Sequence, residues 1–263
     1  MHLEVVQYAL GALSGALVGL TLGLFGGGGS ILAVPLMVYL VGVPNAHMAL
    51  GTSAFAVAAN AAANLIPHAR MGHVRWRCAL IYSAAGIVGA FAGSSLGKLV
   101  NGERLLFLFA ILMVGVGILM LRGRRNPGNP AATCTTENAP KTLGFGAATG
   151  LLSGFFGIGG GFLIVPGLMA ATGMPMIAAV GSSLVAVTAF GLTTTLNYAV
   201  SGLVDWPLAL VFVAGGAAGG TVGAFAAHQM AQSRGRLNLL FAALIFAVAA
   251  YMLWRNAMIF FTV

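Results

Sequence analysis

Two segments of this chain interrupt long apolar stretches with runs of glycine and could bind an anion through their backbone. The candidate binding residues are Gly26, Gly27, Gly28, Gly29 and Ser30 in the first segment and Gly157, Gly159, Gly160 and Gly161 in the second. A helix that begins after such a break has unpaired N–H groups and a partial positive charge in its first turn. Because glycine lets a ligand come close, such a break can form an anion site. The alternative is that the glycines only allow a tight bend and close packing.

Polar side chains follow each break and could continue such a site. Ser53, Asn60, Asn64 and His68 are separated by seven, four and four residues, so they share one face of a helix. The candidate binding side chains are Ser53, Asn60, Asn64, Ser183, Thr194 and Asn197. Amides are costly in lipid without partners and can donate to an oxyanion, whereas the hydroxyls also fit a role in helix–helix contacts. We predict that the asparagines and Thr194 line a polar path.

Other kinds of chemistry have little support in the sequence. None of the four carboxylates lies deep in an apolar stretch, which leaves no candidate for a buried proton relay or a carboxylate ring. His-Glu-x-x-His and paired Cys-x-x-Cys motifs are absent, so we expect no metal. We also expect no cofactor and no nucleic-acid partner. An activated serine with a histidine base is not apparent, and the chain is not predicted to be an enzyme.

The elements that would position these residues are membrane helices. Of the 263 residues, 59 % are hydrophobic and only 6 % are charged, against about 45–50 % and 25 % in soluble proteins. Stretches of membrane length without a charge between their end residues cover 46–66, 77–98, 104–121, 177–199, 206–228 and 237–254. The segments 3–43 and 142–175 are too long for one crossing, and each contains a glycine break. The fold class is therefore an all-α integral membrane protein that contacts the lipid bilayer.

The chain consists of two homologous halves. Residues 15–44 match residues 146–175 at an offset of 131, and after the loss of one residue the offset is 130 through Gly93 and Gly223. Such a long match indicates duplication. We predict a first transmembrane repeat at 1–121, a polar basic linker at 122–141 and a second repeat at 142–263. Each repeat would hold a glycine-broken helix pair and three further helices.

The distribution of Lys and Arg predicts how the halves are oriented. Short cytoplasmic loops collect these residues, and placing 122–141 in the cytoplasm leaves nine inside and three outside if segment 142–175 returns to its starting side. The halves would then be inverted repeats, as in many secondary transporters. A parallel duplication is the alternative, and the segments could be re-entrant or cross twice. We expect a multi-pass protein of the inner (plasma) membrane with a cytoplasmic linker.

The doubled glycine motif resembles that of the sulfite exporter TauE/SafE family of membrane permeases. The resemblance rests on Gly19 to Pro35, on its second copy from Gly150 to Pro166, and on Gly51-Thr52-Ser53 with Gly181-Ser182-Ser183. It implies a permease for sulfite, sulfonates or related small anions. We therefore expect a permease or exporter of a small anionic substrate, with sulfur oxyanions favoured, that works by alternating access at a midplane site made by the two breaks. An anion channel and a non-transporting scaffold subunit are the alternatives, and a homo-oligomer is compatible with the sequence.

Overall fold

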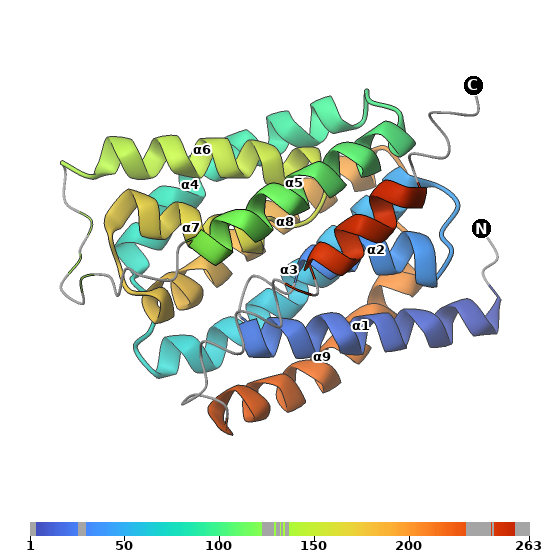
Figure 1. Cartoon of the computed structure of the whole chain (residues 1–263), viewed down its shortest axis with the longest axis horizontal. Coiled ribbons are helices and arrows are strands. Elements are labelled where there is room, and N and C mark those ends of the chain that lie inside the picture. Colours follow the sequence, from blue (N-terminus) through green and yellow to red (C-terminus); the bar gives the residue numbers. More distant parts are fainter. Residues whose placement is uncertain are drawn as a thin grey trace.

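The regular elements of this protein are helices throughout the described part of the chain (Figure 1). The computed structural model describes residues 4–25, 30–122, 129, 132, 134, 137–229, 243 and 245–255. Its elements are α1 (Val5–Phe25), α2 (Ala33–Pro35), η2 (Leu36–Leu40), α3 (Ala46–Arg70), α4 (Trp76–Gly97), α5 (Gly102–Arg122), α6 (Ala139–Phe155), α7 (Gly161–Thr172), α8 (Met176–Val200) and α9 (Trp206–Gln229). A further helix, Ile245–Arg255, follows near the C-terminus.

Five of the described helices are long and apolar enough to cross a membrane. They are Val5–Gly23, Ala46–Arg70, Trp76–Gly97, Met176–Val200 and Trp206–Gly223. The last four coincide with stretches predicted from the absence of charge, and α5 covers a fifth predicted stretch. The protein is thus an all-α, multi-pass integral membrane protein, as predicted. Of the predicted stretch 237–254, residues 237–242 and 244 lie outside the described residues.

One end of the bundle, which we call the α1 end, holds the start of α1 and the segment that follows η2. The side-chain amide of Gln7 donates to the Val41 carbonyl at 3.3 Å. The start of α9 lies at this end as well, since Asp205 N–H donates to Thr52 Oγ1 in the second turn of α3. The ends of α4 and α8 meet here through Lys98, whose Nζ donates to the Asn197 carbonyl and to Ser201 Oγ.

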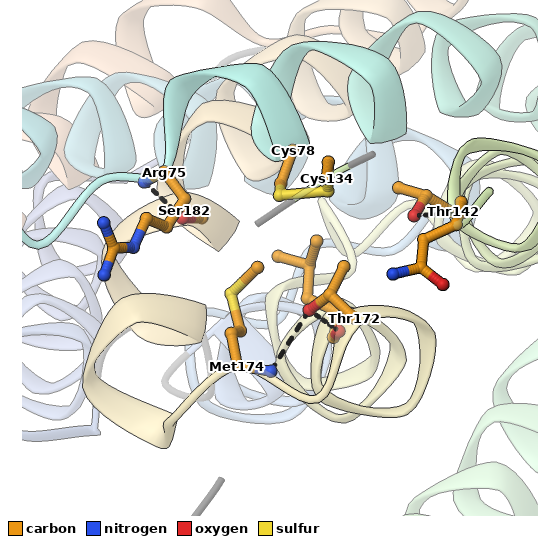
Figure 2. Close-up of a disulfide and its surroundings, with 9 residues drawn as sticks. Arg75, Cys78, Cys134, Thr142, Thr172, Met174 and Ser182 are labelled. Carbon is orange, nitrogen blue, oxygen red and sulfur yellow. Dashed lines mark hydrogen bonds between the residues drawn. A yellow bond between two sulfur atoms is a disulfide. The ribbon is translucent and has the colours of Figure 1, made fainter. Parts of the chain in front are cut away.

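The opposite end, the linker end, holds the described linker residues and the starts of α4, α6 and α8. Cys134 of the linker forms a disulfide with Cys78 in the first turn of α4 (Figure 2). Arg75 N–H donates to Ser182 Oγ in the second turn of α8. Asn129 N–H donates to the Gly173 carbonyl, in the turn between α7 and α8. In Figure 1, α6 begins on the left and α1 begins on the right.

These contacts show that both glycine-broken segments return to the end at which they start. The chain enters with α1 and reaches Val41 beside Gln7 at the α1 end. It enters again with α6, directly after the linker, and reaches Gly173 beside Asn129 at the linker end. The two hairpins therefore enter the bundle from opposite ends.

Each hairpin packs its first helix against a helix of the other half. Helix α1 lies along α9, and α6 lies along α4. We call these two helix contacts the α1–α9 seam and the α4–α6 seam, and glycines let the backbones approach closely in both. A Cβ placed on Gly93 would lie 2.8 Å from the carbonyl carbon of Leu151 in the α4–α6 seam. A Cβ placed on Gly219 would lie 2.7 Å from the carbonyl carbon of Ala16 in the α1–α9 seam. Such backbone-to-backbone approach stabilises helix pairs in membranes, where burial of apolar area supplies little. Helices α3 and α8 pack on each other between the seams, with Gly191 against Ala58.

Candidate functional site

The second glycine break is a short irregular segment between α6 and α7. Helix α6 ends at Phe155 and α7 begins at Gly161. Gly157, Gly159 and Gly160 have φ values of +62°, +65° and +69°, which residues with a Cβ rarely adopt. The sequence needs glycine here because the chain must reverse direction within five residues. The predicted helix start at Gly161 is confirmed.

Several backbone N–H groups of this break have no acceptor within the described part of the chain. The N–H groups of Leu163 and Ile164 donate to the Gly160 carbonyl at 2.9 and 3.0 Å. No described acceptor lies within hydrogen-bond reach of the amides of Gly159, Gly160, Gly161 and Phe162. These amides stand at the N-terminus of α7, where the helix dipole adds partial positive charge. The break therefore has the donors that an anion site requires.

The break lies halfway along the two central helices. A Cβ placed on Gly159 would lie 2.9 Å from Val57 Cγ1 and 3.6 Å from Val187 Cγ1. Val57 is the twelfth of the 25 residues of α3, and Val187 is the twelfth of the 25 residues of α8. Since α3 and α8 are candidate membrane spans, this contact is at the middle of the membrane-crossing part. Gly157 to Gly161 are buried in this conformation.

The first break is only partly described. Gly26, Gly27, Gly28 and Gly29 lie outside the described residues, and so does any contact they make. Ser30 is fully buried at the start of the short apolar helix Ser30–Leu40. A helix thus begins at Ser30 as predicted, and its role in binding stays a prediction.

Ser53 and Ser183 occupy equivalent places in the two central helices. Both are fully buried. Ser53 Oγ donates to the Leu50 carbonyl at 3.1 Å, and Ser183 Oγ donates to the Val180 carbonyl at 2.8 Å. Because each hydroxyl proton is engaged within its own helix, these serines retain only acceptor capacity toward a ligand.

Two buried polar atoms, on Asn60 and Thr194, have no hydrogen-bond partner in the described part of the chain, whereas Asn64 has one. Asn64 Nδ2 donates to the Asn60 carbonyl at 2.8 Å. Asn60 is 2 % exposed and its Nδ2 has no partner, and Thr194 Oγ1 is also buried without one. The Asn60 carboxamide lies against Gly216 of α9. Buried polar atoms are normally paired, so these two atoms require an explanation.

The structure separates Asn197 from the break. Its Nδ2 donates to Ser94 Oγ at 2.6 Å and to Ser95 Oγ at 2.9 Å, while its Oδ1 accepts from Lys98 Nζ. Asn197 is ten residues beyond Val187 on α8, which is about 15 Å along the helix. Its amide joins α8 to α4 at the α1 end.

Sequence reasoning missed the side chains that enclose the break. Besides Val57 and Val187, Leu50 faces Gly157, and Ser153 faces Gly160 with its buried Oγ unpartnered. Val57 and Val187 correspond at the offset of 130, and that correspondence is the signal that could have found them. Apolar residues at matched positions carry no chemical signature, so the spacing alone did not single them out.

In the described part of the chain, no three His, Cys, Asp or Glu residues are grouped as metal ligands.

Comparison with known proteins decides the family. The family described as Sulfite exporter TauE/SafE matches residues 11–252. The chain belongs to the TauE/SafE family. As a member it is a membrane transporter and not an enzyme.

Relatives of this TauE/SafE protein come from several bacteria. A "Probable membrane transporter protein" of Xylella fastidiosa (strain 9a5c) is 55 % identical over 244 residues, which is 92 % of this chain and 94 % of the relative. The "Probable membrane transporter protein YunE" of Bacillus subtilis (strain 168) is 28 % identical, over 86 % of this chain and 89 % of the relative. No solved structure gives a significant match.

Proposed function

We propose that this TauE/SafE transporter exports a small oxyanion, with sulfite and organic sulfonates as the favoured substrates, by alternating access at a midplane site. The observation that carries the proposal is the position of Gly159, which contacts the midpoints of α3 and α8 and is followed by amides with no described acceptor. The substrate class follows from the family description, Sulfite exporter TauE/SafE.

The charges of the chain support an anion over a cation. All four carboxylates fall near the ends of elements or in connecting segments: Glu4 precedes α1, Glu103 begins α5, Glu137 precedes α6 and Asp205 precedes α9. A cation at the midplane would therefore have no ionised partner from the chain. An oxyanion would be held by backbone N–H groups and the positive end of α7, as anions are at helix N-termini.

The arrangement of the hairpins supports alternating access. They enter from opposite ends, and each packs on a helix of the other half. We infer that the halves are inverted repeats around one site between α3 and α8, as in secondary transporters with discontinuous helices. Rocking of the α1–α9 pair against the α4–α6 pair would open the site to each end in turn.

Uptake into liposomes tests the proposal. Purified protein is reconstituted and offered sulfite, sulfate, taurine, sulfoacetate and thiosulfate. We expect saturable uptake of at least one sulfur anion, with counterflow when the same anion is inside. Single-channel currents without counterflow would instead identify an anion channel, and absence of flux for every anion would leave the scaffold role.

Two glycine variants test the site itself. Gly159→Ala adds a methyl group that meets Val57 in a left-handed backbone, whereas Gly202→Ala imposes the same kind of backbone, with φ +67°, where nothing lies within 4 Å. Both variants carry a backbone cost of roughly 1–2 kcal/mol. We expect Gly159→Ala to lose most transport while inserting normally, and Gly202→Ala to keep it. Equal transport by the two folded variants would refute the site.

A further inference from the structure

The contact of α3 with α9 in one place and the contact of α8 with α4 in another are equivalent by the repeat, and we call them the first and the second junction. The two junctions hold different residues. In the first junction, the Asn60 carboxamide of α3 lies against Gly216 of α9. In the second, the Phe190 ring of α8 lies against Gly86 of α4. Asn60 corresponds to Phe190 and Gly86 corresponds to Gly216 at the same offset of 130. One junction therefore holds an amide at the position where the other holds an aromatic ring.

The second junction is closed by its own side chains. The Tyr82 ring stacks on Phe190 with an interplanar angle of 17° and a centroid distance of 6.3 Å. The Tyr82 hydroxyl is 2.6 Å from Thr149 Oγ1 of α6 and lies against Gly167 of α7. Every polar side-chain atom of this group has a partner, so nothing here calls for a ligand.

The first junction lacks that closure. The positions equivalent to Tyr82 and Thr149 are occupied by Phe212 and Val18, which are fully buried and carry no side-chain hydrogen-bonding atom. Asn60 Nδ2 accordingly remains without an acceptor although the residue is 2 % exposed. An apolar residue would be more stable at such a place in a membrane protein. The orphan atom is a donor, and its missing partner must be an acceptor.

We propose that Asn60 Nδ2 is a substrate-selecting donor for an oxygen of the transported anion, and that of the two equivalent junctions only that of α1, α3 and α9 contributes a side-chain amide. The Tyr82–Phe190–Thr149 junction is a fixed, dry contact. The inference rests on the proposed anion transport and adds to it an asymmetry between the halves. Asn64 Nδ2 donates to the backbone carbonyl of Asn60, so it does not engage the Asn60 carboxamide.

The test compares variants that separate hydrogen bonding from packing. Asn60→Leu keeps the side-chain volume and removes the donor, so we expect the apparent KM for sulfite to rise about tenfold or more, as for a lost bond to a charged group. Its thermal stability should equal or exceed that of the wild type. Tyr82→Phe, which removes the bond to Thr149 in the dry junction, should lower stability and leave the KM unchanged.

A glycine pair on α9 gives a second, independent readout. A Cβ at Gly216 would meet the Asn60 amide, whereas a Cβ at Gly220 would be 3.6 Å or more from every neighbour. We expect Gly216→Ala to raise the KM by displacing the amide, and Gly220→Ala to behave as wild type. In Asn60→Ala/Gly216→Ala the methyl group fills the space left by the amide. That double variant should regain thermal stability and keep its raised KM.

The outcomes separate this inference from the proposed function. Folded Asn60→Leu with wild-type KM would overturn the role of Asn60 while leaving anion transport in place. Recovery of the wild-type KM in Asn60→Ala/Gly216→Ala would reduce Asn60 to a packing residue and would also overturn it. Wild-type protein that moves none of the tested anions would end the proposed function, and this inference with it.

Discussion

The sulfur atoms of Cys78 and Cys134 are bonded to each other, with their Cα atoms 5.3 Å apart. Both residues are 2 % exposed. The bond fastens the linker to the first turn of α4, close to where Asn129 bonds to the turn before α8. The linker is thus attached to both halves at the same end of the bundle, to the first half by the disulfide (Figure 2) and to the second half by Asn129.

This pair reports which side of the membrane the linker faces. The sequence assigns nine of the twelve Lys and Arg residues to cytoplasmic segments, the linker among them. Disulfides rarely persist in the cytosol. We therefore expect both cysteines to be thiols in growing cells and to form the disulfide when the purified protein is oxidised.

Alkylation of acid-quenched cells measures the state of this pair. Because both sulfurs are buried, the quenched cells are denatured in excess maleimide, which blocks free thiols, and disulfide sulfurs are then reduced and labelled with a mass tag. Two untagged sulfurs would agree with the cytoplasmic assignment, and Cys78→Ser serves as the single-thiol control. Full tagging in cells would show that the linker end faces the periplasm and that the predicted orientation is reversed.

A second prediction concerns the seam of α4 and α6. A Cβ at Gly89 would lie 2.8 Å from Leu151 N and would press on the Ala147 carbonyl, whereas a Cβ at Gly115 of α5 meets nothing within 4 Å. Overpacking of this kind costs roughly 1–3 kcal/mol. We expect Gly89→Ala to lower the melting temperature in detergent and Gly115→Ala to leave it unchanged. Equal melting temperatures for Gly89→Ala and Gly115→Ala would mean that α4 and α6 can move apart without loss of stability.

A third prediction concerns Lys98, which binds the last turn of α8. Its Nζ donates to the carbonyl and Oδ1 of Asn197 and to Ser201 Oγ, at 2.9–3.1 Å. Bonds of a charged donor are worth about 1.5–3 kcal/mol, so Lys98→Met should lower the stability of the folded protein. Lys141→Met, at an exposed position of α6, is the matched control.

The same residues decide whether Asn197 has a role in transport. If Asn197 only joins α8 to α4, Asn197→Ala should resemble Lys98→Met, and the double variant should lose less stability than the sum of both. The KM of Asn197→Ala for the transported anion should stay at the wild-type value. A raised KM in Asn197→Ala at normal stability would return this residue to the substrate path.

The sequence predicted the membrane helices well because absence of charge and length define them. Trp76 and Trp206, which correspond at the offset of 130, begin α4 and α9. Glycines spaced by four residues favour close helix contacts, but this spacing does not select the partner helix. Gly15 and Gly93 both lie in such runs, and only the fold places Gly15 against Phe212 and Gly93 against Leu151. Spacing assigns residues to a helix face, and the face does not determine which helix covers it.

The candidate site was predicted less completely for the same reason. The sequence named Gly159 and Asn60 as candidates, and their role in binding stays a prediction; the structure adds that Asn60 Nδ2 is buried without a partner among the described residues. Asn197 carries the same side chain as Asn60, but its amide already forms hydrogen bonds with Ser94, Ser95 and Lys98 at the end of another helix. Those partners are about 100 residues away in the chain, with a separation of 99 from Lys98, so no local pattern reveals them.

The last prediction concerns Val57 and Val187, which contact Gly159 from matched positions of α3 and α8. If the transported anion passes this point, the two side chains set the width of the path.

Val187→Phe would fill the space beside Gly159 and should abolish uptake. Val57→Ala removes two methyl groups, which costs stability through the cavity left behind, and should admit larger sulfonates relative to sulfite. The uptake ratio of sulfoacetate to sulfite in liposomes measures the effect, with Val213→Ala on α9 as a control at a half-buried position. An unchanged ratio in Val57→Ala, together with normal uptake by Val187→Phe, would place the path away from Gly159.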